Sequence, residues 1–437
     1  MIEHRSMGRL ATAAALALSA ACASGDSAPG APGSGDTLLA DLLASRPDLF
    51  ADVLEDPAAH RLKMELVVVE EGAGGPRLRR HTYDQGPAYF YPASTVKTAA
   101  VIAAFLELDR LERSGVGTDV ADGWTAGPAA GAPVGRDTAL RFHPLFEGEG
   151  VEERDLSHLD GGTITAGHEA RKVLLISDNA AYNRLYELSG NDGVNGALRD
   201  AGLDRTTIFH RLSEFRSPAD QLRVPAIDLL DGAGQVIAST PERTAPVPGT
   251  NAGVGGLELG DAHTSGGEVL AGPMSFAQKN HMPLGDLVDM NIMLLRPDLV
   301  DALRHERGGK PTVGFPLSED DRGFIRAAMA STPGESEDPR YDPQKFPADY
   351  SKFLLPGLLR VRSMDELVVR DKVGRAYGFS VTNSEVVDLR TGRTFFLAAT
   401  LYTNPNGVVG DGVYDYARAD RFLGDLGEVV GRAVLGD

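Results

Sequence analysis

Residues 98–115, TAAVIAAFLELDRLERSG, form a stretch that is apolar nearly all round. A helix of this composition is typical of a protein interior, so the remaining elements must pack around it. Ser94 and Lys97 stand immediately before the stretch. Residues three apart on a helix share a face, so we expect the hydroxyl and the ammonium to meet where the buried helix begins.

β-Rich segments stand at both ends of the chain, and helical patterns fill the middle. Strand patterns occur at residues 62–70, 77–83, 366–373, 378–389 and 393–403. Helical spacing occurs at residues 37–54, 274–304, 320–330 and 414–435, and in two segments that flank Ser177-Asp178-Asn179. Residues 116–146 are expected to be mostly loop, and residues 224–273 are weakly patterned.

This order of elements predicts an α/β protein of the α+β type. We expect an antiparallel sheet built from both termini and flanked by helices, with a helical subdomain inserted between its strands. The sheet subdomain would comprise residues 37–115 and 360–437, and the helical subdomain residues 116–359.

The N-terminus has the pattern of an export signal. Two arginines precede a short apolar run at residues 10–21, which has too few residues to span a bilayer permanently. Residues 1–21 are therefore expected to be a cleaved signal peptide. The Gly/Ser/Pro/Ala-rich residues 22–36 are expected to form a flexible tether. We expect export to the periplasm or cell envelope.

Cys22 is the only cysteine, so no intramolecular disulfide can form. Its position after the apolar run resembles that of the lipid-bearing cysteine of a bacterial lipoprotein. The lipid-attachment box prefers leucine three positions earlier, where this chain has Ser19. Lipidation of Cys22 is expected, and this anchor would be the only attachment to a membrane. Cleavage with release of the protein is the alternative.

Charge and histidine spacing exclude several kinds of partner. The formal net charge of −19 argues against a surface for nucleic acid or anionic membranes. The ten histidines show no His-x-His or His-Glu-x-x-His spacing, so neither a metal site nor a cofactor is expected. His158 and His168 are interpreted as ordinary helix-end residues. We expect a monomer.

Three short motifs carry the chemistry, and they occur in the order Ser94-Thr-Val-Lys97, Ser177-Asp-Asn179 and Lys372-Val-Gly374. A serine hydroxyl becomes a good nucleophile only when a base removes its proton. Lys97 can be that base if burial and a second cation, Lys372, lower its pKa. Each motif alone is weak evidence, because a lone Ser-x-x-Lys also occurs on surface helices and Ser-Asp-Asn is often a helix cap.

The order and spacing of the motifs resemble those of the serine β-lactamase and penicillin-binding-protein superfamily, most closely its class A β-lactamase branch. The similarity extends through YPASTVKTAAVIAA, ITAGHEARKVLLISDNAAYNRLYEL and DELVVRDKVGRAYG. It leaves residues 216–359 without a counterpart. The resemblance implies the β-lactamase/transpeptidase-like fold and an enzyme that forms an acyl-serine.

The resemblance also implies catalytic roles for Ser94 (nucleophile), Lys97 (base) and Ser177 (proton relay), and substrate-binding roles for Asn179, Lys372, Gly374 and Arg375. Asn179 would hold the acyl amide of the substrate, and Lys372 would attract a substrate carboxylate. The oxyanion needs two aimed N–H donors, worth about 3 kcal/mol each. In the family these come from the backbone positions that correspond to Ser94 and Arg375.

Two residues depart from the family pattern. Val373 stands where the family has Thr or Ser, and its side chain cannot donate a hydrogen bond to a carboxylate. Class A enzymes also carry a Glu-x-x-Leu-Asn loop whose glutamate activates the deacylating water. Glu214 lies at about the right distance along the chain but lacks the following Leu-Asn. Glu214 is the candidate base, and a surface loop carboxylate is the alternative that this context favours.

Three functions remain open. The leading one is an exported hydrolase that acts through an acyl-serine on an amide, ester or β-lactam, with a small-molecule or peptidoglycan-derived substrate. The segments 210–213, 372–378 and 402–407 resemble a group of exported serine hydrolases related to class A enzymes. The second is a D-alanyl peptidase, transpeptidase or esterase of the penicillin-binding type. The third is a catalytically silent binder of cell-wall peptides.

Overall fold

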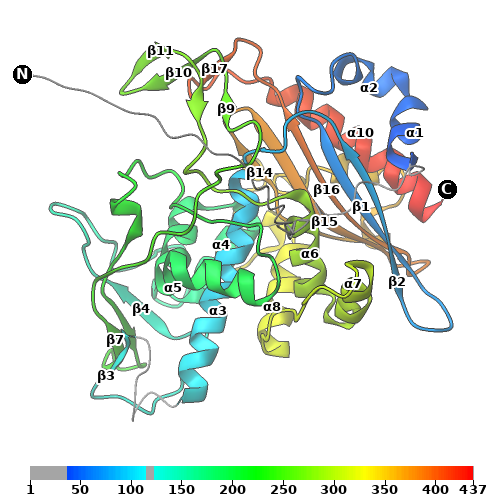
Figure 1. Cartoon of the computed structure of the whole chain (residues 1–437). Helices are drawn as coiled ribbons and strands as arrows, with labels where there is room; N and C mark the ends of the chain where they lie inside the picture. Colours follow the sequence, from blue (N-terminus) through cyan, green and yellow to red (C-terminus); the bar gives the residue numbers. More distant parts are fainter. Residues whose placement is uncertain (1–36, 115–122, 437) are drawn as a thin grey trace, which may run out of the picture. The chain divides into compact units, whose positions relative to one another are not determined.

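The computed structural model describes residues 37–114 and 123–436. Its main sheet has the strand order β13-β15-β16-β1-β2, and the short strand β14 also pairs with β15. β1 (Lys63–Glu70) runs antiparallel to β16 (Thr394–Tyr402), with Lys63 opposite Thr400. The blue N-terminal strand therefore lies beside an orange strand from the C-terminal part of the chain (Figure 1). The prediction of an antiparallel sheet built from both ends, and with it the fold class, is confirmed.

The other strands of this sheet are β2 (Arg77–Asp84), β13 (Leu367–Asp371), β14 (Gly374–Ala376) and β15 (Phe379–Asp388). The α-helices are α1 (Leu38–Ala44), α2 (Pro47–Leu54), α3 (Lys97–Ser114), α4 (Ala166–Ile176), α5 (Asn179–Asp200), α6 (Leu284–Leu295), α7 (Val300–Glu306), α8 (Glu319–Ala330), α9 (Leu355–Leu358) and α10 (Tyr416–Leu435). The small sheets contain β3 (Thr125–Ala126), β4 (Ala139–Phe142), β5 (Arg223–Val224), β6 (Ile227–Leu230), β7 (Val236–Thr240), β8 (Arg243–Thr244), β9 (Glu258–Leu259), β10 (Ala262–Ser265), β11 (Glu268–Ala271), β12 (Met274–Ser275) and β17 (Val408–Val409).

The main sheet separates two apolar cores. Successive side chains of a strand point to opposite faces. Phe395 and Leu397 of β16 accordingly belong to a core that they share with α1, α2, α9 and α10. Phe396 and Ala398 belong to a larger core that contains α3, α5 and α6. Helices therefore cover both faces of the sheet.

Helix α3 is buried in the larger core, as its sequence predicts. None of residues 99–105 is more than 3% exposed, and the helix packs chiefly against α5. This burial fixes the start of α3, and hence Lys97, inside the protein.

Some predicted element boundaries were wrong, and prolines account for two of them. Residues 37–54 form two helices, because Pro47 lacks the N–H that would continue the first helix and instead occupies the first turn of the second. The predicted helix at residues 274–304 begins only at Leu284, after Pro283 in an extended conformation. The expected loop at residues 116–146 contains β3 and β4, which join β6 and β7 in a four-stranded sheet.

The signal peptide predicted at residues 1–21, the tether predicted at residues 22–36 and Cys22 all lie outside the described residues. None of the described helices has the length and apolar character needed to cross a membrane. The subdomain boundaries stay a prediction.

Close packing of α9 on α10 predicts different effects on stability when alanine replaces either of two glycines. A Cβ on Gly357 would lie 1.7 Å from the carbonyl oxygen of Gly424, whereas a Cβ on Gly424 would meet only the Pro356 side chain, at 3.8 Å. We expect Gly357→Ala to lower the free energy of unfolding by about 1–3 kcal/mol or more, because the helices must separate. The matched control, Gly424→Ala, is expected to leave it unchanged or raise it by up to about 1 kcal/mol. Urea unfolding of both variants tests this, and equal stabilities would contradict a close approach of the two helices at Gly357.

Candidate active site

Ser94 lies in a 3₁₀ turn (η1, Ala93–Val96) that leads directly into α3. Ala93 has a φ of +50°, a conformation that costs a non-glycine residue free energy and that must be held by its surroundings. Ser94 lines a cavity of about 940 Å³ on one side and a cavity of about 420 Å³ on the other. The nucleophile candidate thus stands where two cavities meet.

Lys97 is fully buried, and its ammonium contacts the second motif. Lys97 Nζ lies 3.2 Å from Ser177 Oγ and 2.6 Å from Asn179 Oδ1, and it also contacts the backbone carbonyl of Ser177. Burial lowers the pKa of Lys97 well below its ordinary value, and the charge of Lys372 lowers it further. Both causes are those expected from the sequence for a lysine base.

Ser177 occupies the junction between α4 and α5. It caps the C-terminus of α4 in the left-handed conformation, with a φ of +62°, and the next residue, Asp178, caps the N-terminus of α5. Ser177 Oγ lies 2.9 Å from Lys372 Nζ as well as 3.2 Å from Lys97 Nζ. The hydroxyl therefore joins the two lysines, and the helix junction holds it there.

Lys372 follows β13 and is fully buried. Its ammonium also donates to the carbonyl oxygen of Val373, at 2.9 Å. Burial lowers the pKa of Lys372 to about 7, although the neighbouring Asp371 opposes the shift. At neutral pH a substantial fraction of Lys372 is therefore uncharged.

Gly374 allows β14 to approach the nucleophile turn. A Cβ at this position would lie 2.6 Å from Ser94 N and 2.7 Å from the carbonyl oxygen of Pro92, so only glycine fits. The backbone of Arg375 follows directly after this contact. Its side chain is already occupied: the guanidinium pairs with Asp420 and lies 4.8 Å from the ring centroid of Tyr416.

Asn179 is held on both sides of its amide. Its oxygen accepts from Lys97, and its Nδ2 donates to Ser213 Oγ at 2.7 Å. Ser213 has a φ of +58°. Nδ2 carries a second hydrogen, which can donate to a substrate while the first stays bound to Ser213. The sequence singled out residues 210–213 but did not predict this contact.

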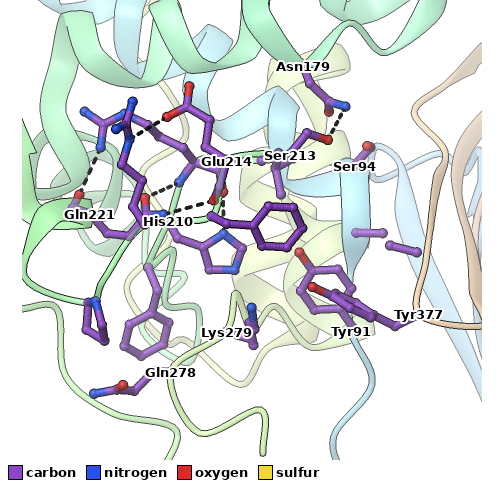
Figure 2. A pocket seen from close by; sticks show the side chains of 18 of the residues that line it. Tyr91, Ser94, Asn179, His210, Ser213, Glu214, Gln221, Gln278, Lys279 and Tyr377 are labelled. Carbon is purple, nitrogen blue, oxygen red and sulfur yellow. Dashed lines mark hydrogen bonds and ion pairs between the residues drawn. The ribbon is translucent and has the colours of Figure 1, made fainter. Parts of the chain in front are cut away.

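Glu214 lines the larger cavity together with Ser94, but other groups bind its carboxylate. Glu214 Oε1 accepts from Asn183 at 2.9 Å, and Oε2 accepts from Arg216 Nε at 3.0 Å. Figure 2 shows Glu214 on the far side of Ser213 from Ser94. Both oxygens of the carboxylate already accept hydrogen bonds, so the geometry gives little support to a deacylating role.

Aromatic residues form one wall of the larger cavity (Figure 2). The rings of Tyr91 and Tyr377 meet edge to face, with centroids 5.2 Å apart, and His210 stacks on Tyr91 at 6.4 Å. Burial lowers the pKa of His210 to about 4, so its imidazole is neutral. Nothing in the spacing of these residues indicated that they would meet.

Comparisons with known proteins agree with the motifs. Residues 149–244 match the Beta-lactamase2 family model, the beta-lactamase enzyme family. No curated protein matches the sequence. Solved structures that the chain resembles include a β-lactamase from Sphaerobacter thermophilus (15% identity, 90% of this chain and 96% of that chain, TM-score 0.42) and one from Xanthomonas campestris pv. campestris (16%, 92% and 98%, 0.43). A third is the β-lactamase from Streptomyces albus G (14%, 90% and 99%, 0.45).

The identities and TM-scores of these structures are too low to assign a family. The resemblance rests on the family match and on the motifs. The family match includes Ser177, Asn179 and Glu214, and the fold brings Ser94, Lys97 and Lys372 to the same place. Residues 149–244 thus resemble the beta-lactamase enzyme family, and the motifs outside this range agree with the serine β-lactamase and penicillin-binding-protein superfamily.

Proposed function

We propose that this chain is an exported serine hydrolase that acts through an acyl-serine at Ser94 on an amide, ester or β-lactam. The observation that supports this most is the position of the Ser177 hydroxyl, whose Oγ lies 3.2 Å from Lys97 Nζ and 2.9 Å from Lys372 Nζ. One hydroxyl between two buried lysines offers a path for a proton from Lys97, the base that would activate Ser94, to a leaving group.

We propose the following acylation step. Uncharged Lys97 takes the proton of Ser94, and the Ser94 oxygen forms a bond to the substrate carbonyl carbon. The backbone N–H groups of Ser94 and Arg375 stabilise the oxyanion. When the bond to the leaving group breaks, Ser177 gives its proton to the leaving atom. The Lys97 ammonium, which holds the proton taken from Ser94, then reprotonates Ser177.

The charge of the site argues against strong recognition of a substrate carboxylate. The pKa of Lys372 is lowered to about 7, Val373 offers no hydroxyl, and Arg375 is paired with Asp420. We propose a small-molecule or peptidoglycan-derived substrate whose acyl part occupies the larger, aromatic cavity. We further propose that the protein acts as a monomer.

Slow deacylation is a second possibility that one observation favours. The carboxylate of Glu214 is bound by Arg216 and Asn183, so it is poorly placed to activate water. An acyl-enzyme formed here would then persist, as in a transpeptidase or a penicillin-binding protein.

We propose export to the periplasm or cell envelope through residues 1–21, with a lipid anchor on Cys22. The support for this is the sequence pattern of the N-terminus, with its single cysteine at the end of the apolar run.

Labelling of Ser94 tests the function. We expect a fluorescent penicillin or an activated-serine probe to label the protein and Ser94→Ala to remain unlabelled. Lys97→Met is expected to slow labelling about 10²–10⁴-fold. Because Lys97 acts when uncharged and its pKa is lowered, the labelling rate should rise with pH and level off well below 10.5. Failure of every probe to label the folded wild-type protein would favour a silent binder.

Replacement of Glu214 tests deacylation. We expect Glu214→Gln to change the rate of loss of the label by less than about threefold, whereas loss of a general base would slow it about 10²–10⁴-fold. The control is Glu149→Gln, which removes the other carboxylate bound by Arg216. The rate is followed by gel fluorescence after excess probe is removed, and a large decrease confined to Glu214→Gln would restore this residue as the base.

Fractionation of cells tests the anchor. We expect the full chain to sediment with membranes and Cys22→Ser to be recovered in the soluble fraction, because one lipid-bearing sulfur would be lost. Incorporation of a radioactive fatty acid provides the direct measurement. An equal distribution of the two proteins would contradict lipidation.

A further inference from the structure

Outside the active site, two histidines and an aspartate converge at the beginning of α4. His168, in the first turn of α4, has a wholly buried side chain, and His158 stacks on it with ring centroids 4.3 Å apart. Asp338 reaches them from a loop that follows α8. Its side chain is 26% exposed. The cluster is distinct from the Ser94 cleft, since none of its three residues lines either cavity beside Ser94.

The hydrogen bonds around the two rings determine which nitrogens carry protons. His158 Nδ1 lies 2.5 Å from the carbonyl oxygen of Thr163, which can only accept, so Nδ1 is protonated. The Ser157 hydroxyl donates to Asp155, so it must accept from His168 Nε2 at 3.0 Å. When both rings are neutral, the other nitrogen of each therefore presents a lone pair.

These lone pairs face a carboxylate. His158 Nε2 lies 3.4 Å from Asp338 Oδ2, and His168 Nδ1 lies 3.7 Å from Asp338 Oδ1. His168 Nδ1 is buried and has no hydrogen-bond partner among the described residues. Asp338 Oδ1 accepts one hydrogen bond, from Leu159 N at 3.0 Å, and a cation placed between the three groups would bind the lone pairs that face one another.

Nearby cations are engaged elsewhere. Arg171 donates to the backbone carbonyl oxygen of Asp338, at 3.4 Å. Lys172 pairs with Asp155, and Arg184 lies 2.9 Å from Glu169. Among the described residues, none of these three cations pairs with the Asp338 carboxylate.

We propose that His158 Nε2, His168 Nδ1 and the Asp338 carboxylate bind a divalent transition-metal ion of the zinc type. Bonds of 2.0–2.1 Å to a tetrahedral zinc ion place its ligand atoms about 3.3 Å apart, close to the separations found here. The outer nitrogens already have the hydrogen-bond partners that orient metal-binding histidines. Water supplies the fourth ligand through the exposed side of Asp338.

Binding must also change the geometry of the two rings. Their planes are only 13° apart, and an ion cannot lie in both planes of a stacked pair. His158, whose side chain is 11% exposed, must therefore tilt away from the buried His168. The bound ion would join the loop at residues 155–163 and the loop around Asp338 to α4, whose other end carries Ser177. Its role is structural, and it revises the interpretation of both histidines as ordinary helix-end residues.

Zinc titration of the purified chain, after dialysis against a chelator, tests the proposal. Isothermal titration calorimetry is expected to show one ion per chain at micromolar affinity or tighter. Zinc should raise the midpoint of thermal unfolding, and the chelator should lower it again. Asp338→Asn and His168→Gln should each weaken binding at least tenfold. Cobalt(II) in place of zinc should give visible absorption bands that Asp338→Asn removes.

His143→Gln is the matched control, because His143 follows β4 and pairs with Asp228 of β6, away from the cluster, and its loss should not alter zinc affinity. Labelling of Ser94 reports whether each variant is folded, and it does not depend on the zinc proposal. A variant that is labelled normally but does not bind zinc has lost the ion and kept the fold. Asp338→Asn keeps the shape of the side chain and so serves if His168→Gln fails to fold. No zinc binding by the wild-type chain, or equal affinity in wild type and Asp338→Asn, overturns the proposal.

Discussion

Burial of two lysines around one serine hydroxyl is the arrangement on which the rest of the cleft depends. Lys97 and Lys372 are removed from water, and each contacts Ser177 Oγ. Two charged lysines buried this close together would cost free energy, so a charge on either lysine favours the neutral form of the other. Neither has a carboxylate within ion-pair distance among the described residues, since their partners are hydroxyl, amide and carbonyl oxygens. The buried helix α3 and the main sheet are what keep the two lysines desolvated.

The same arrangement explains where the backbone is strained. Ala93, Ser177, Ser213 and Tyr377 all have a positive φ, and all four line the cavities beside Ser94. Such conformations cost about 1–3 kcal/mol each and persist only where the surrounding contacts determine them. Here they shape the turn before Ser94, the helix junction at Ser177 and two wall residues of one cleft. The strain supports a functional site independently of the family match.

Much of this was predictable from sequence, for identifiable reasons. A helix that is apolar on all sides has to be buried, so α3 and the lysine at its start could be placed in advance. The expected contact between the Ser94 hydroxyl and the Lys97 ammonium stays a prediction. Contacts between segments that lie far apart in the sequence could not be predicted. The hydrogen bond from Asn179 to Ser213 and the convergence of Asp338 on His158 and His168 depend on the tertiary fold, and no spacing rule encodes them. The pairing of Glu214 with Arg216, two residues later, was a local contact whose geometry the pattern left open.

The pairing of β1 with β16 has a consequence for how the molecule assembles. Lys63 and Thr400 are neighbours in the sheet although nearly the whole described chain separates them. Closing so large a loop costs entropy before the contact repays it, and folds rich in such contacts form slowly. A chain made from its N-terminus cannot complete the central sheet until its final strands have been synthesised. Until then β1 has only the hairpin with β2 as a sheet partner, and Lys372, which follows the late strand β13, cannot yet reach Ser177. The cleft is therefore among the last parts of the molecule to become complete.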